Sequence, residues 1–138
     1  MLKTGNIIQS GPYAGFEVID VYSRADAIED GLLIDVSETA KEAGIVFPVA
    51  VTNTVWETYI VPDERSRKWG QSESGRLWDT VWMLRCAIKR YPSGTDTIHY
   101  SLYYIMKEKQ RRLVRLKAIC GPGDNGEPVI TIMLPEED

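Results

Sequence analysis

The sequence has few of the residues on which common catalytic and metal sites depend. His99 is the only histidine, and the only two cysteines, Cys86 and Cys120, are far apart along the chain. One histidine argues against a Ser-His-Asp triad, a two-histidine metal site and phosphotransfer between histidines. The cysteine spacing matches no zinc motif, and the apolar surroundings of both residues favour free, buried thiols over a disulfide. Free thiols favour a reducing, cytoplasmic location.

Long apolar runs and familiar motifs are also missing. No apolar run approaches the ~20 residues of a transmembrane helix, and the first residues lack the apolar core of a signal peptide. The chain contains no glycine-rich dinucleotide motif, no Gly-x-Ser-x-Gly and no His-Glu-x-x-His. The sequence therefore implies no catalytic residues, no cofactor and no metal.

The composition is that of an ordinary globular protein, but the charge is unevenly distributed. The chain has 138 residues, of which 43% are hydrophobic and 26% charged, which predicts a single domain over 1–138. The net charge of -4 combines 7 basic and 13 acidic residues in 1–80, 9 and 2 in 85–117, and only 5 acidic residues in 118–138. These regions can neutralise one another within the fold or serve as surfaces for partners.

The last third of the chain predicts three antiparallel strands. The segment 97–106 alternates, with apolar residues at even positions and polar residues, including His99, at most odd ones. Val114, Leu116 and Ala118 alternate with basic residues in the next segment, and 129–134 is apolar on both faces. Alternation of period two places one face of each strand in a core and the other in water, whereas the third strand suits a central position. His99 is therefore expected to be solvated.

A long helix is predicted over 75–90, with Ser74 as its N-cap. Leu77, Val81 and Leu84 recur at helical spacing, and Trp78 and Trp82 form an adjacent stripe. The tryptophan pair could stack on a base or ligand, but such stripes more often belong to a core. The predicted fold is α+β, with the three-stranded antiparallel meander packed against this helix.

Short helices and strands are expected in the N-terminal half. Ser23, Ser37 and either Thr52 or Asn53 are candidate N-caps, because each precedes a short helical pattern. The segment 63–74 predicts a polar loop.

The loop Gly121–Pro128 has two interpretations. Its glycines, Asp124, Asn125 and Glu127 could cradle a cation or a phosphate, but three oxygen ligands are few for calcium and no P-loop motif follows. A rigid connection between strands, set by glycine and proline, is the favoured interpretation.

Two charged surfaces are candidate binding sites. Acidic residues of the first half could form a protein-binding face, although helix caps and solvated helix faces also account for them, and a carboxylate-based enzyme site would require them to converge. The acidic set is Asp26, Glu29, Asp30, Glu38 and Glu42. The predicted hairpin is basic and could follow a phosphate backbone, or it could simply be a solvated strand face. The basic set is Lys107, Lys109, Arg111, Arg112, Arg115 and Lys117.

Four stretches of the chain resemble an uncharacterised bacterial family associated with plasmids, integrative elements and phages. They are VIDVYSRADAIEDGLLIDVSETAKEAG, FPVAVT followed by Val55-Trp56, SGRLWDTVWM, and CGPGDNGEPVITIMLPEED. The resemblance implies a mobile-element accessory protein and carries over no catalytic residue. The first hypothesis is a non-enzymatic inhibitor of a host defence protein, such as a CRISPR effector or a restriction enzyme, whose acidic surface imitates phosphate. The alternative is a nucleic-acid-binding module that uses the basic hairpin.

Overall fold

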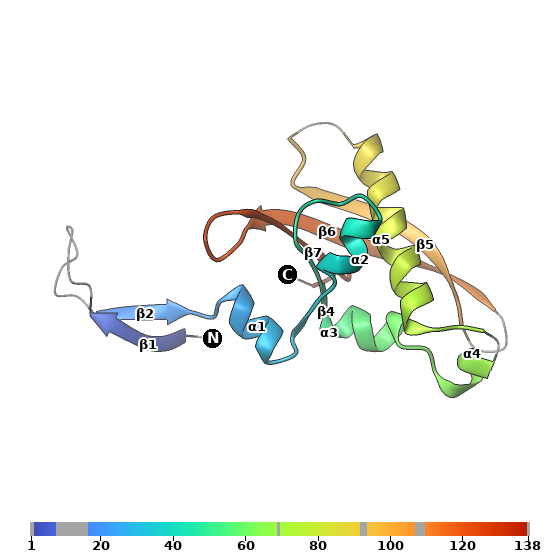
Figure 1. Ribbon diagram of the computed structural model, residues 1–138, viewed down its shortest axis with the longest axis horizontal. Coiled ribbons are helices and arrows are strands. Elements are labelled where there is room, and N and C mark those ends of the chain that lie inside the picture. Colours follow the sequence, from blue (N-terminus) through green and yellow to red (C-terminus); the bar gives the residue numbers. More distant parts are fainter. Residues whose placement is uncertain (1, 8–16, 69, 92–93, 107–109, 138) are drawn as a thin grey trace.

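The fold is α+β, as predicted, and Figure 1 shows the arrangement of its elements in a computed structural model. The structure describes residues 2–7, 17–68, 70–91, 94–106 and 110–137, with the side chains of 2–7 and 17–21 excepted. In chain order the elements are β1 (Leu2–Ile7), β2 (Glu17–Val21), α1 (Arg24–Glu29), β3 (Leu33–Asp35), α2 (Ser37–Glu42), β4 (Val49–Thr52), α3 (Asn53–Val55), the π-helical turn η1 (Trp56–Ile60), α4 (Glu64–Lys68), α5 (Glu73–Arg90), β5 (Thr97–Ile105), β6 (Arg111–Pro122) and β7 (Pro128–Met133).

The strands form two sheets. β1 and β2 form a separate antiparallel pair, which projects away from the rest of the molecule at the left of Figure 1. The other sheet has the order β3-β4-β7-β6-β5, in which β5, β6 and β7 are the predicted antiparallel meander. β7 is central, as its two apolar faces indicated, because it pairs in parallel with β4 on its other side.

One face of the five-stranded sheet carries the hydrophobic core. Tyr100, Leu102 and Tyr104 of β5 are buried there, as the alternation predicted, together with facing residues of β6 and β7. Helix α5 lies across this face with Leu77, Val81 and Leu84 buried against it, and α2, α3 and η1 complete the cover. The predicted packing of the meander against the long helix is confirmed.

The opposite face of the sheet is covered only in part. Ala50, Val129 and Met133 are buried on this side. The C-terminal turn reaches it through Glu137, which accepts a hydrogen bond from Thr52 Oγ1 at 2.9 Å. Over β5 and β6 this face stays exposed, and it presents the odd-numbered residues of β5.

Helix α5 begins earlier than predicted. Its N-cap is Ser72 rather than Ser74, because the Ser72 hydroxyl accepts the amide of Gly75 at 3.1 Å and so adds Glu73 and Ser74 to the first turn. The segment predicted to be a polar loop contains the short helix α4. Asp63 caps that helix by accepting the amide of Ser66 at 2.7 Å.

The other caps are partly as predicted. Ser23 forms a capping box with Asp26, and Thr52 accepts the amide of Val55. Ser37 is not an N-cap: its hydroxyl lies 2.6 Å from an Asp35 oxygen, and its oxygen also accepts the amide of Val49. The N-cap position is occupied by Val36, whose side chain makes no cap hydrogen bond, and the Asp35 carboxylate accepts the Ser37 amide at 3.1 Å.

Candidate functional site

The described residues contain no metal-ligating cluster. No group of three or more His, Cys, Asp or Glu residues among them could hold a metal ion. No helix among these residues is long and apolar enough to cross a membrane. Cys86 and Cys120 are free, as predicted, but each is only half-buried.

His99 differs from its prediction as a solvated residue. It is half-buried, and its Nδ1 atom is enclosed without a hydrogen-bond partner among the described residues. Its neighbour across the ladder is Lys117, whose side chain turns to the C-terminal segment.

The loop between β6 and β7 holds helix α1 in place. Asp124 accepts the backbone amides of Arg24 and Ala25 at 2.8 and 3.0 Å, at the first turn of α1. The Arg24 guanidinium donates to Thr131 Oγ1 at 2.7 Å and to the Ile130 carbonyl at 2.8 Å. These contacts support the interpretation of the loop as a structural connection, because its central carboxylate is already bound by the protein.

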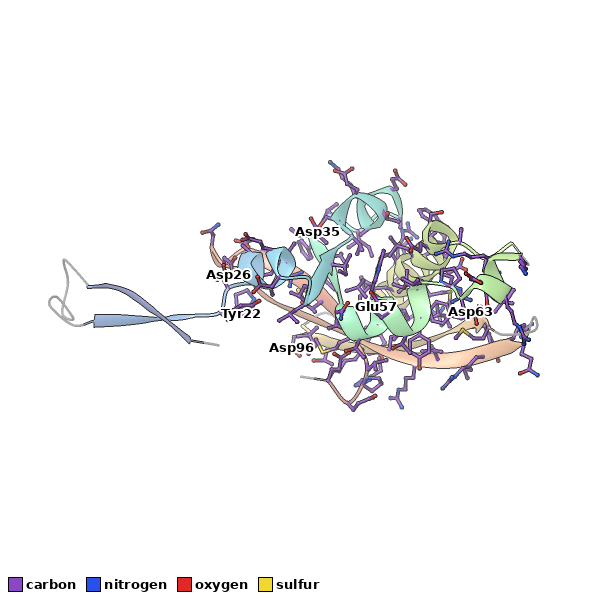
Figure 2. The ribbon with its side chains drawn as sticks, turned by 90° about the horizontal axis from the view of Figure 1, so that it is seen from below. Tyr22, Asp26, Asp35, Glu57, Asp63 and Asp96 are labelled. Atoms are coloured by element: carbon purple, nitrogen blue, oxygen red, sulfur yellow. The ribbon has the colours of Figure 1, made fainter. Side chains whose placement is uncertain are left out.

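Two of the five predicted acidic binding residues have structural roles. Asp26 completes the capping box of α1, and Asp30 accepts a hydrogen bond from the Tyr22 hydroxyl. That hydrogen bond, together with nearby negative charge, raises the pKa of Tyr22 to about 12. Figure 2 shows Tyr22 and Asp26 side by side where β2 meets α1. The carboxylates of Glu29, Glu38 and Glu42 are exposed and remain candidates for binding.

The predicted basic set does not form one surface. Arg111 and Arg115 are exposed on the open face of the sheet, whereas Arg112 pairs with Tyr104 and belongs to the helix-covered side. Lys117 donates to the carbonyls of Pro135 and Glu137 at 3.1 and 2.5 Å. Lys107 and Lys109 lie outside the described residues.

The open face of β5 and β6 combines apolar and basic side chains. Tyr103 is 54% exposed and Leu113, directly opposite on β6, is 58% exposed. The guanidinium carbon of Arg111 lies 4.4 Å from the centre of the Tyr103 ring, which is cation–π geometry. We refer to Tyr103, Arg111, Leu113 and Arg115 as the open-face patch.

A second exposed aromatic group lies on α5. The rings of Trp78 and Trp82 stack with centroids 5.7 Å apart, and the Arg85 guanidinium lies 5.0 Å from the centre of the Trp82 ring. The two tryptophans are 37% and 40% exposed, so the prediction that they belong to the core is wrong. They project from the flank of the helix, about a quarter turn from the stripe that Leu77 and Val81 bury. We refer to Trp78, Trp82 and Arg85 as the tryptophan ladder.

Helix α2 and the loop that follows it lie beside this ladder. α2 packs against α5, and Arg85 lies directly over Gly44, where an added Cβ would be only 2.8 Å from Arg85 Nε. Gly44 also has a φ of 97°, so a side chain at this position would strain the backbone as well. The glycine that ends α2 therefore makes room for the arginine of the ladder.

A cavity of about 320 Å³ opens at the C-terminal end of α5. Its floor belongs to the core side of the sheet, and its rim comes from α5 and from the loops on either side of it. The floor and rim include Ile45, Phe47, Arg85, Lys89, Asp96 and Cys120. Sequence reasoning missed this cavity, because its walls come from five separate stretches between residues 44 and 130. The apolar pair Val46-Phe47, in the loop after α2, is the feature of the sequence that could have indicated an apolar site there.

Comparison with known proteins identifies the family of the chain. A family model described as a family of unknown function (DUF6573) matches residues 10–138. No curated protein and no solved structure matches the chain. The match covers almost the whole sequence, and the chain therefore belongs to this family of unknown function.

Proposed function

We propose that the chain is a non-enzymatic binding module that docks on another protein through the tryptophan ladder and the adjoining helix α2. The observation that carries the proposal is the stacking of two exposed tryptophans under an arginine, on a helix that already buries another stripe of side chains against the sheet. Tryptophan and arginine are the residues most enriched among the energetic centres of protein interfaces.

The geometry of the ladder favours binding. Trp78, Trp82 and Arg85 are spaced four and three residues apart, so their side chains form a row along one flank of α5. Stacking holds each of them in one orientation before a partner arrives, which reduces the conformational entropy lost on association. The ring faces still turned to water can then be buried by an apolar surface of the partner.

The helix that packs against α5 carries acidic residues. Glu38 and Glu42 are exposed on α2, beside α5. A rim of carboxylates would attract a basic partner and speed its association. This retains the acidic-surface hypothesis for Glu38 and Glu42. Glu29 is exposed on a separate helix, α1, and Asp26 and Asp30 would act chiefly on the stability of that helix.

The biological setting forms part of the proposal. The resemblance to proteins of plasmids, integrative elements and phages supports a mobile-element accessory protein that acts in the cytoplasm. A host defence protein that handles nucleic acid fits as the target, because its basic groove would complement the acidic rim. A CRISPR effector or a restriction enzyme has such a groove.

The test is a pull-down from host lysate with nuclease treatment, using the wild type and two matched variants. We expect one stoichiometric protein partner to be retained by the wild type and by Tyr103→Ala, and to be lost with Trp78→Ala/Trp82→Ala. Truncating an interface centre costs about 2 kcal/mol or more, which is roughly a 30-fold loss of affinity. Retention of the partner by a folded double variant would remove the ladder from the interface.

A second candidate function, nucleic-acid binding, is favoured by the open-face patch. Tyr103 presents a ring on which a base could stack, and Arg111 and Arg115 could contact phosphates on either side of it. The acidic balance of the chain and the internal use of Lys117 weaken this candidate.

Fluorescence anisotropy with a labelled single-stranded oligonucleotide separates the two functions. If the patch binds nucleic acid, affinity falls steeply with salt, and Tyr103→Ala weakens it by ~1–3 kcal/mol through lost stacking. An affinity that does not change with salt concentration contradicts this candidate, and so does an affinity that the combined Tyr103→Ala and Arg115→Glu substitutions leave unchanged.

A further inference from the structure

The cavity at the C-terminal end of α5 has an apolar interior that reaches the core. Its floor includes Ile98, Ala118, Cys120 and Ile130, from three adjacent strands of the sheet. Ile45 closes it on the side of α2. A volume of about 320 Å³ is at the lower end of the range for small-molecule sites in proteins, which is roughly 300–1,000 Å³.

Large hydrophobic side chains gather at the mouth instead of closing it. Val46 is 84% exposed, Phe47 40% and Ile88 37%, and all three line the cavity. Leaving three such side chains in water beside an open apolar cavity is unfavourable in the free protein. A bound apolar group would cover the floor and these side chains together.

The charges at the mouth favour a negative ligand. Arg85 and Lys89 both line the cavity, one helical turn apart on α5, and neither forms an ion pair with a described residue. Like charges at this spacing repel each other on a helix surface. Asp96, the one carboxylate among the described residues that line the cavity, accepts a hydrogen bond from Thr97 Oγ1 at 3.2 Å. An anion placed between the two cations would relieve their repulsion.

From these observations we infer that the cavity binds a small amphipathic anion, with an apolar body against the strands and an acidic head group between Arg85 and Lys89. The site shares Arg85 with the tryptophan ladder, but neither tryptophan lines the cavity. Cys120 on the floor provides a chemical reporter, because a bound ligand shields its thiol.

The probe is sodium decanoate below its micelle concentration, and binding is measured by calorimetry on the full chain. We expect saturable binding at one site, with decanol at least about tenfold weaker because it lacks the charge, and with decyltrimethylammonium not bound. Equal binding of decanoate, decanol and the cation would show non-specific adsorption to apolar surface and would overturn the inference. Absence of decanoate binding would overturn it as well.

Two charge variants on α5 locate the head group. Lys89→Glu should weaken decanoate about tenfold or more. Arg90→Glu makes the same change of charge at the next residue, which is exposed and does not line the cavity, and should leave binding within about twofold. Equal effects of the two variants would place the ligand elsewhere.

Alkylation of Cys120 locates the apolar body. In a Cys86→Ser background, iodoacetamide reports on Cys120 alone, and decanoate should slow the reaction at the concentrations at which calorimetry shows binding. An unchanged alkylation rate at saturating decanoate would place the apolar chain outside the cavity. The Trp78→Ala variant, which leaves Trp82 under Arg85, should bind decanoate normally, so the two proposals can fail separately.

Discussion

Tyr103 and Tyr104 are neighbours in the sequence, yet they belong to opposite faces of β5 and have opposite roles. Tyr104 is 1% exposed, stacks on Tyr59 with ring centroids 5.6 Å apart, and its hydroxyl lies 2.6 Å from Thr80 Oγ1. Tyr103 is 54% exposed, and its ring lies under Arg111. Residue type therefore does not decide the role of a tyrosine here. The period-two alternation of the strand decides it, by placing one ring under α5 and the other in water.

The same contrast extends along the two strands. On the helix-covered side, polar groups are paired inside the core: Thr80 donates to the Arg76 carbonyl, so the Tyr104 hydroxyl donates to Thr80, and burial raises the pKa of Tyr104. On the open side, Tyr103 and Leu113 leave apolar surface uncovered. The first side contains the core, and the second leaves these apolar side chains in water.

The largest effect is expected from Tyr104→Ala, compared with Tyr103→Ala. Removing the buried ring should lower the free energy of unfolding by ~3–5 kcal/mol, because a cavity replaces it and Thr80 loses its partner. Removing the exposed ring should cost within about 0.5 kcal/mol. Urea unfolding followed by circular dichroism measures both variants, and comparable losses would show that the two faces do not differ as described.

Arg76 offers the next test of the helix-covered side. It is 2% exposed, and its guanidinium donates to the carbonyls of Tyr59 and Ile105 at 2.9 and 2.5 Å, joining η1, α5 and the end of β5. Arg76→Met should cost ~1.5–3 kcal/mol, because it removes a charged donor and leaves two carbonyls unpaired.

Arg115→Met is the matched control for Arg76→Met, since Arg115 is exposed on the open face. It should change the urea midpoint little. A variant of Arg76 as stable as that control would mean that water replaces the guanidinium without loss.

The sequence predicted the features that depend on local pattern. The buried faces of β5 and β6 were predicted correctly, because burial of one face imposes an alternation that the sequence shows. The N-cap at Ser23 was predicted correctly, because a capping box involves only four consecutive residues. Helix α4 was missed because its residues show no apolar periodicity. The start of α5 was misplaced by two residues because Ser72 and Ser74 are both good caps.

The candidate sites were less predictable, because they depend on tertiary neighbours. On a helical wheel Trp78 and Trp82 lie next to the buried stripe, so the sequence alone does not show whether the sheet covers them. The structure shows that it does not, because both side chains are exposed. The residues of the basic set are close together in sequence, but the structure separates them. Strand alternation places Arg112 on the helix-covered face, and the C-terminal segment binds Lys117. Sequence patterns thus located the faces of strands and helices but not what covers them.

Asp124 tests whether contacts outside the core side also carry stability. Its carboxylate accepts two amides at the start of α1 from a loop a hundred residues away in sequence. Asp124→Ala should cost ~0.5–2 kcal/mol, as loss of a helix cap does, and the loss should be concentrated in α1. Hydrogen exchange should show faster exchange of the Arg24 and Ala25 amides, whereas amides of β6 should be unaffected.

The smallest expected effect concerns a tyrosine whose pKa is raised without burial in the core. Tyr22 donates to Asp30, and this contact raises the pKa of Tyr22 to about 12 from a usual value near 10. The contact should therefore contribute fully below pH 10 and be lost as the pH rises from about 10 to about 12, because the ionised phenol cannot donate. In alkaline titrations followed by near-ultraviolet absorbance, Asp30→Asn should shift one tyrosine transition toward pH 10. Tyr22→Phe should abolish that transition and so assign it. If Asp30→Asn leaves the titration unchanged, the pKa of Tyr22 does not depend on this carboxylate. The contrast between burial at Tyr104 and a carboxylate at Tyr22 would then have to be abandoned.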